Sequence, residues 1–272
     1  MSQRSVIVIG SGFAGLSAAA FMAKEGWDVT VIEKHNTAGG GARQLKENGF
    51  TFDRGPSFYW MPDVFERFFA SFEKKVSDYY TLQRLDPSYR VYWNDGYTDI
   101  PADPEALKQI FESLEPGSAA KLDRYLQEAA YKYAIGMKKM VYKPGLSVFE
   151  FMDWETIKGL FKLDVFTSME KHVQKYFQHP KLRQLMEFPV LFLGALPAHT
   201  PGLYSLMNYA DIKLGTWYPK GGMFKIVDGM VSLAKELGVE IKLNREVTGF
   251  DFEKNKNDFF IERKKFQEKS HC

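Results

Sequence analysis

The chain has 272 residues, 45% of them hydrophobic, a formal net charge of +2 and one cysteine, Cys272. This length and composition allow a substantial core in one large domain or two smaller ones. The small, interleaved charge argues against a nucleic-acid surface, and the single cysteine excludes an internal disulfide and favours a reducing compartment. No apolar run approaches the ~20 residues that a membrane-spanning helix needs.

The N-terminal stretch has the pattern of a β-α-β unit. Residues 6–9 predict a buried strand, and the run Gly10-Ser11-Gly12-Phe13-Ala14-Gly15 predicts a tight turn. An Ala-rich helix then extends to Gly26, and residues 28–33 predict a second strand. The first two glycines let the backbone approach a pyrophosphate, and the third lets the helix pack close to the strand. Glu33 ends the second strand, where a carboxylate can accept hydrogen bonds from a ribose.

Glycine-rich turns are common, so the turn alone is a weak signal; its surrounding strand, helix and acid favour a dinucleotide site. A secretory signal is the alternative, because Arg4 precedes an apolar run and Ala18-Ala19-Ala20 resembles a cleavage site. Gly10, Ser11 and Gly12 interrupt that run, which favours the dinucleotide site over the signal.

A second glycine cluster follows the second strand. Gly39-Gly40-Gly41 precedes Arg43, and Lys34 adjoins Glu33. Such a cluster is often only a turn. Its position next to the predicted ribose-binding acid favours a phosphate-binding role, with Gly40, Arg43 and Lys34 as further cofactor-binding candidates, which suits FAD.

Two longer motifs make the pattern specific. Residues 49–57 predict a short strand and a Gly-Pro turn, within the run Phe50-Thr51-Phe52-Asp53-Arg54-Gly55-Pro56-Ser57-Phe58-Tyr59. The run Trp217-Tyr218-Pro219-Lys220-Gly221-Gly222 stands far downstream. With the N-terminal glycine motifs, these segments resemble bacterial-type phytoene desaturases, the FAD-dependent carotenoid desaturases of the flavin amine oxidase superfamily.

The resemblance implies an α/β fold: a Rossmann-like FAD-binding domain with an inserted, mainly helical substrate or cap domain. The expected division is 1–100 and 216–252 for the FAD-binding domain, 101–215 for the inserted domain, and 253–272 for a polar tail. The family places the flavin diphosphate over Gly10 to Gly15, the ribose at Glu33, the isoalloxazine near Gly55-Pro56-Ser57 and the adenine against the backbone at Val247. Gly41 stands where the family usually has an arginine, so either Arg43 compensates or FAD binding is weakened.

The middle of the chain carries fewer signals. The aromatic residues of the segment 58–72 predict core or a channel wall. Residues 81–100 predict a hairpin around Asn94-Asp95-Gly96, and Asp103-Pro104 predicts a helix start. Residues 118–192 look mainly helical, and the apolar segment 188–197 predicts a buried helix or a tunnel wall.

The polar residues of this helical part fall into two groups. Its tyrosines at 125, 131 and 133 and the Lys-rich stretch 132–143 form either a lipid-facing surface or a solvated face. His172, His179 and His199 lack companions at metal-ligand spacing, so no metal is expected.

Near the end, residues 224–237 predict a helix that Gly238 terminates, and residues 239–243 predict a strand. The polar composition of 253–272 predicts an exposed tail. Because family members are nearly twice as long, we expect a truncated chain with an incomplete sheet that expresses poorly in soluble form.

The implied activity is FAD-dependent desaturation of phytoene or a similar carotenoid precursor, in which hydride leaves an allylic carbon for the flavin. Glu150 and Asp153 are candidates for acid–base help, and quinone or oxygen is the expected electron acceptor. The resemblance also implies a cytoplasmic protein, peripheral on the inner membrane surface. The alternatives are another superfamily flavoenzyme such as an amine oxidase or carotenoid isomerase, an inactive fragment that keeps a nucleotide-binding fold, and, more distantly, an NAD dehydrogenase.

Overall fold

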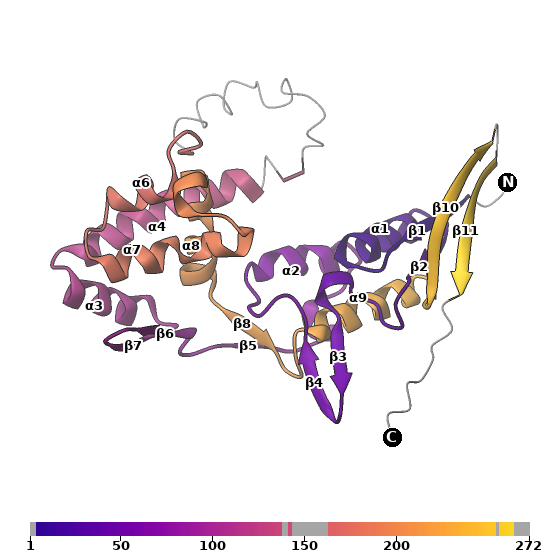
Figure 1. The fold of residues 1–272 in the computed structure, drawn as a ribbon, viewed down its shortest axis with the longest axis horizontal. Coiled ribbons are helices and arrows are strands. Elements are labelled where there is room, and N and C mark those ends of the chain that lie inside the picture. The colour runs from indigo at the N-terminus through magenta and orange to yellow at the C-terminus, as the bar shows by residue number, and fades with distance from the viewer. Residues whose placement is uncertain (1–3, 138–140, 143–162, 254–255, 264–272) are drawn as a thin grey trace. The chain divides into compact units, whose positions relative to one another are not determined.

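The computed structural model describes residues 4–137, 141–142, 163–253 and 256–263 (Figure 1). The chain forms two compact units. Unit 1 comprises Met1–Gln83 and Tyr218–Cys272, and unit 2 comprises Arg84–Trp217. The hairpin before residue 100 therefore belongs to the inserted unit, whereas the sequence placed it in the first domain.

Unit 1 is built on a parallel sheet with the strand order β1-β2-β9. The strands are β1 (Ser5–Ile9), β2 (Asp28–Ile32) and β9 (Glu240–Lys242). Helices α1 (Phe13–Lys24) and α9 (Phe224–Glu236) pack together beside it (Figure 1). Alanines from both helices, Ala19 and Ala234, are fully buried against Val29 and Val31 of β2. This arrangement confirms the predicted Rossmann-like α/β fold.

Unit 1 contains further elements besides this sheet and its two helices. They are η1 (Gly40–Ala42), β3 (Gln44–Glu47), β4 (Phe50–Asp53), α2 (Pro62–Ala70), η2 (Val76–Asp78), β10 (Arg245–Glu253) and β11 (Lys256–Arg263). β3 pairs antiparallel with β4, and β10 with β11. The prediction of a polar tail from residue 253 is wrong for 256–263, because the backbone of that segment pairs with β10. The aromatic segment 58–72 contributes core, with Tyr59 and Phe69 almost completely buried.

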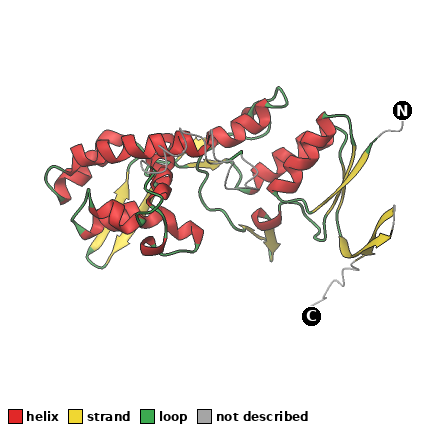
Figure 2. Cartoon of the chain, turned by 90° about the horizontal axis from the view of Figure 1, so that it is seen from above, coloured by secondary structure: helices red, strands yellow, loops and turns green. Residues whose placement is uncertain are grey.

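The chain crosses between the units in β5 (Leu82–Arg84) and β8 (Trp217–Pro219), which pair with each other. Unit 2 is mainly helical, as the red ribbons of Figure 2 show. Among the described residues of unit 2, the α-helices are α3 (Pro104–Leu114), α4 (Ser118–Ile135), α6 (Met169–Gln174), α7 (Pro180–Glu187) and α8 (Leu206–Tyr209). The described part of unit 2 also contains the 3-10 helices η5 (Phe188–Leu193), η6 (Pro197–His199) and η7 (Gly202–Ser205) and the π-helix η8 (Ala210–Leu214).

Local sequence signals account for several boundaries in unit 2. The predicted hairpin is present as β6 (Tyr89–Trp93) and β7 (Gly96–Ile100), paired antiparallel around its Asn-Asp-Gly turn. Asp103 caps α3 by accepting hydrogen bonds from the backbone N–H groups of Glu105 and Ala106. The unit's core gathers buried side chains of α3, α4, α6 and α7, including Phe111, Leu122 and Leu182.

Two expectations for unit 2 are corrected. The segment 188–197 is not a buried helix: η5 is a 3-10 helix, and Leu191, Phe192, Leu193 and Leu196 are 60%, 53%, 48% and 61% exposed. The supposed surface of α4 is partly core, because Tyr125 and Lys132 are completely buried. Within the described part of the chain, no helix is both long enough and apolar enough to cross a membrane.

Candidate cofactor-binding site

A pocket of about 530 Å³ lies in unit 1, where β1 and β2 end. Nucleotides bind at this edge in α/β proteins, since the carboxyl ends of parallel strands and the following helix N-termini meet there. Four segments line the pocket: the end of β1 with its turn, the end of β2, the glycine loop and the start of β10. The residues are Ile9, Gly10, Gly12, Ile32, Glu33, Lys34, His35, Gly40, Gly41, Arg43, Arg245, Glu246 and Val247.

The structure brings together many of the predicted cofactor residues. Those in the lining are Gly10, Gly12, Glu33, Lys34, Gly40, Arg43 and Val247. The turn into α1 and its first residues hold Ser11, Phe13, Ala14 and Gly15. The residues Gly55, Pro56 and Ser57 are exposed and do not line this pocket. The proposed acid–base residues Glu150 and Asp153 lie outside the described residues.

Close backbone contacts explain why glycines occupy the turn. A Cβ on Gly15 would lie 2.0 Å from the carbonyl oxygen of Gly10, so α1 can begin this close to β1 only with glycine there. A Cβ on Gly40 would lie 3.0 Å from the Cα of Gly12. The backbone N–H of Gly39 donates to the Ser11 carbonyl at 2.9 Å. The two glycine segments therefore meet as bare backbone, which leaves room for a phosphate group in front of α1.

Glu33 is buried, with only 4% of its surface exposed. Its Oε2 accepts hydrogen bonds from the Ser11 backbone N–H at 2.9 Å and the Ser11 hydroxyl at 2.8 Å. Its Oε1 accepts one from the His35 backbone N–H at 2.9 Å. Burial alone would raise the pKa of Glu33, but these hydrogen bonds outweigh it and lower the pKa. The carboxylate is thus held ionised and oriented, and its remaining lone-pair positions can accept from a ribose hydroxyl.

Basic side chains line the same pocket. Arg43 is half-buried and donates from Nε to the Gly40 carbonyl at 2.8 Å, which holds its guanidinium beside the glycine loop. Lys34 follows the end of β2, and Arg245 is the first residue of β10. Gly41, at the position where the resembled family has arginine, also lines the pocket, and a Cβ there would meet nothing within 4 Å.

Arg245 and Glu246 were missed by the sequence reasoning. Backbone hydrogen bonds bring this segment to the pocket: the Glu33 N–H donates to the Lys242 carbonyl, and the Arg245 N–H donates to the Glu33 carbonyl, both at 2.9 Å. A usable signal was present, since Arg245 follows the predicted strand 239–243 and stands two residues before Val247.

Asp53, at the end of β4, connects this strand to the start of α9 and to Tyr218 of β8. Its Oδ2 accepts from the Met223 backbone N–H at 2.6 Å and from the Tyr218 hydroxyl at 3.1 Å, and its Oδ1 from the Phe224 backbone N–H at 3.3 Å. The carboxylate therefore caps α9. Two residues later, a Cβ on Gly55 would lie 2.5 Å from the Gly41 carbonyl oxygen, so this turn backs the glycine loop.

These features suit a dinucleotide cofactor. The first N–H groups of α1 have no intrahelical partner and carry the positive end of the helix dipole. The glycine cradle and the flanking cations match a pyrophosphate, and the oriented carboxylate matches a ribose.

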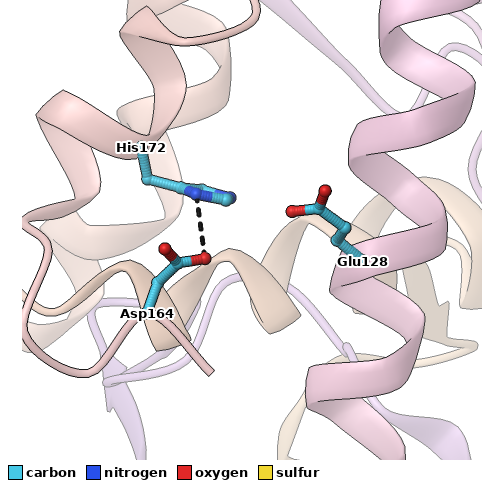
Figure 3. A group of neighbouring side chains, drawn as sticks. All are labelled: Glu128, Asp164 and His172. Atoms are coloured by element: carbon cyan, nitrogen blue, oxygen red, sulfur yellow. Dashed lines mark ion pairs between the residues drawn. The ribbon is translucent and has the colours of Figure 1, made fainter. Parts of the chain in front are cut away.

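Unit 2 contains a second polar cluster that the sequence did not reveal. His172 was expected to be isolated, yet ligand atoms of Glu128, Asp164 and His172 all lie within 4.8 Å of one another (Figure 3). His172 Nδ1 lies 3.2 Å from Asp164 Oδ2 and has no hydrogen-bond partner among the described residues. Such a set of donors could bind a metal ion.

The buried ammonium of Lys132 decides against a metal at this cluster. Lys132 Nζ lies 2.8 Å from Asp164 Oδ2 and 3.2 Å from His172 Nε2, and donates to the Gly202 carbonyl and the Ser205 hydroxyl. Burial, followed by the Lys132 charge, lowers the pKa of His172 to about 4. The protein's own cation thus already neutralises Asp164, and a second positive ion would be repelled.

Comparison with known proteins places these features in a family. A model described as flavin containing amine oxidoreductase matches residues 13–266. A carotenoid 3,4-desaturase of Haloarcula japonica is 42% identical over 96% of this chain and 53% of its own length. A 4,4'-diapophytoene desaturase (4,4'-diaponeurosporene-forming) of Staphylococcus aureus is 35% identical over 89% of this chain and 48% of its own length. The chain spans about half the length of these curated relatives.

Solved structures show the same fold at lower identity. An oxidoreductase from Methanosarcina mazei aligns with a TM-score of 0.56 at 17% identity, over 96% of this chain and 56% of that one. A putrescine oxidase bound to putrescine aligns with a TM-score of 0.59 at 19% identity, over 95% of this chain and 55% of that one.

Proposed function

Because the chain belongs to the flavin containing amine oxidoreductase family, we propose that it forms the FAD-binding half, with its inserted unit, of a carotenoid desaturase. The observation that carries the proposal is the pocket at the ends of β1 and β2, where glycine turn, oriented Glu33 and cations converge. The names of the relatives at 42% and 35% identity support a carotenoid substrate.

In this proposal the chain's own groups bind each part of FAD. The N-terminus of α1 with Gly10 and Gly12 holds the pyrophosphate, assisted by Arg43 and Arg245. Glu33 orients the ribose, and the backbone at Val247 contacts the adenine. FAD bound there would supply the oxidising power, as the acceptor of a hydride from an allylic carbon of the polyene. The protein supplies position and electrostatics, and Glu150 and Asp153 remain candidates for receiving the proton from the neighbouring carbon.

The substrate we propose is phytoene or a related colourless precursor, with quinone or oxygen as electron acceptor. We also propose peripheral attachment to the cytoplasmic face of the membrane, because long polyenes partition into lipid. The exposed apolar side chains at Leu191, Phe192, Leu193 and Leu196 support lipid contact by unit 2. An apolar patch of this kind favours insertion into the interfacial region.

Cofactor binding tests the first half of the proposal. Purified protein is titrated with FAD and followed by flavin absorbance and fluorescence. We expect the native chain to bind FAD. Glu33→Gln should bind FAD at least tenfold more weakly, because it loses about one charge-assisted hydrogen bond. The control Glu240→Gln should bind FAD as tightly as the native chain. Glu240 is an exposed acid at the start of β9 and does not line the pocket. Protein that stays colourless and cannot be reconstituted with FAD would contradict the proposal.

Substrate identity separates the alternatives. Protein reconstituted with FAD is incubated with phytoene in liposomes and, separately, with putrescine, and the pigments and hydrogen peroxide are measured. New conjugated double bonds support desaturation. Amine-dependent peroxide would favour an amine oxidase, and flavin binding without turnover in either assay would favour a nucleotide-binding fragment.

A further inference from the structure

Unit 2 contains a polar pocket of about 710 Å³, called here the α4 pocket, whose described lining residues all belong to this unit. Arg124 and Glu128 reach it from α4, where they stand one turn apart on the same face of the helix. Asp164, Lys175 and Tyr176 line it from the segments before and after α6. A molecule in this pocket therefore meets both acidic and basic side chains.

The side chain of His172 lies behind the α4 pocket and is only 1% exposed. In Figure 3 its ring points toward Glu128, with the Asp164 carboxylate beside it, and both of these residues line the pocket. Ligand atoms of the three side chains all lie within 4.8 Å of one another. His172 Nδ1 has no hydrogen-bond partner in the described part of the chain. Because an unpaired buried polar atom costs free energy, this position favours a ligand atom that pairs with it.

Lys132 determines which kind of group His172 can bind. An ammonium group donates and cannot accept, so His172 Nε2, 3.2 Å from Lys132 Nζ, is the acceptor of that contact. In a neutral imidazole the proton then lies on Nδ1, which makes Nδ1–H a buried donor. A group placed between Nδ1–H and the carboxylates of Glu128 and Asp164 must accept from the ring and donate to a carboxylate. A hydroxyl does both, whereas an ammonium cannot accept and an ionised carboxylate cannot donate.

The basic side chains add a second requirement. Asp164 is already paired with Lys132 at 2.8 Å and with Lys175 at 3.2 Å. Arg124 makes no hydrogen bond or ion pair with the described residues. These three cations face the two acids Asp164 and Glu128, so the cluster keeps one positive charge. A guanidinium without a partner in such a pocket suits a phosphate group, which it can bind through two parallel hydrogen bonds.

We propose that the α4 pocket binds a phosphate ester that carries a free hydroxyl, of which glycerol phosphate is the simplest example. The phosphate contacts Arg124 and Lys175, and the hydroxyl accepts from His172 Nδ1–H and donates to Glu128 or Asp164. The same chemistry occurs in a soluble glycerol phosphate and in the headgroup of phosphatidylglycerol. The site lies in unit 2 and needs no flavin, so it stands or falls independently of the proposed function.

The first test is a calorimetric titration of the whole 272-residue chain with glycerol 3-phosphate, inorganic phosphate and glycerol. We expect glycerol 3-phosphate to bind at least about tenfold more tightly than either of the others, because only it fills both positions. Arg124→Gln should weaken its binding by about tenfold or more. The control Lys171→Gln, at an exposed residue of α6 outside the pocket lining, removes the same charge and should bind like the native chain.

The second test removes the buried donor. His172→Phe should bind glycerol 3-phosphate no more tightly than inorganic phosphate, because the hydroxyl loses its partner. Circular dichroism establishes that this variant folds, and Glu128→Ala, at an exposed residue, tests the same hydroxyl contact independently. Equal affinity of the native chain for glycerol 3-phosphate and inorganic phosphate would overturn the inference, as would binding that neither Arg124→Gln nor His172→Phe weakens.

Vesicle sedimentation separates the two sources of the ligand. Binding to phosphatidylglycerol vesicles but not to phosphatidylcholine vesicles, lost in Arg124→Gln and kept in Lys171→Gln, would assign a lipid headgroup. Binding of free glycerol 3-phosphate without this vesicle preference would assign a soluble ligand. Either result upholds the site, and a chain that binds neither glycerol 3-phosphate nor phosphatidylglycerol vesicles refutes it.

Discussion

Removal of the Asp53 carboxylate tests how unit 1 holds its two chain segments together. Asp53 lies at the end of β4 and accepts hydrogen bonds from the backbone N–H groups of Met223 and Phe224, the hydroxyl of Tyr218 and the amide of Gln44. The two backbone donors belong to the start of α9. Asp53→Ala therefore removes a helix cap and leaves half-buried donors without their acceptor.

The expected cost follows from these contacts. Loss of an N-cap costs about 1 kcal/mol, and a hydrogen bond to a charged acceptor contributes about 1.5–3 kcal/mol, with strong overlap between the two. We expect Asp53→Ala to reduce the free energy of unfolding by about 2–4 kcal/mol. Asp53→Asn keeps one oxygen and should cost roughly half as much. Flavin affinity should fall as well, because the Gly55 turn that follows Asp53 backs the pocket residue Gly41.

Urea denaturation followed by circular dichroism measures the effect. The control is Asp103→Ala in unit 2, where the carboxylate caps α3 with two backbone bonds of 3.2–3.3 Å and should cost only about 1 kcal/mol. If Asp53→Ala costs no more than Asp103→Ala, the carboxylate does not join β4 to α9 in the way the distances indicate.

Further predictions concern the glycines and the buried titratable groups. Gly15→Ala should destabilise the protein by about 3 kcal/mol, measured by urea denaturation, because its Cβ would overlap the Gly10 carbonyl; stability equal to the native chain would refute this. Gly41→Arg should bind FAD about five- to tenfold more tightly in a fluorescence titration, through one added charge-assisted contact, with Gly41→Ala unchanged. The lowered pKa of Glu33 contributes stability at neutral pH that is lost as pH falls below its usual value of about 4.3. The stability gap between the native chain and Glu33→Gln should therefore close in acid, and a pH-independent gap would count against it. Because the pKa of His172 is lowered to about 4, unfolding takes up a proton as pH falls from about 6.5 to 4, so stability declines in that window and His172→Gln should flatten the decline.

Local sequence signals identified many of the residues that meet at the unit 1 pocket, and they identified fewer features of unit 2. The glycine turn, Glu33 and the second glycine cluster are determined by short-range backbone requirements, such as the close approach of Gly15 to Gly10. These requirements leave a visible pattern in a single sequence. The contribution of Arg245 depends on the neighbouring order of β2 and β9, which only the folded sheet specifies.

Unit 2 was predicted less well for a related reason. Lys132 looked like part of a charged helix face, yet it is buried because Asp164, His172 and Ser205 arrive from segments 32 to 73 residues away. The apolar segment at η5 looked like core, but two of its residues, Pro189 and Val190, are buried whereas the following leucines are exposed. The spacing of apolar residues along a sequence indicates which side chains prefer to be buried, but it does not identify the segment that buries them.

The crossing strands β5 and β8 give unit 2 an unusual degree of modularity. The Leu85 backbone N–H donates to the Thr216 carbonyl at 3.0 Å, so the first and last residues of the insertion lie side by side. An insertion whose ends already touch can be excised and replaced by a short turn without stretching the host chain. Under the proposed function, in which unit 2 carries substrate choice, exchanging this unit between homologous flavoproteins at the one junction would separate substrate choice from cofactor binding.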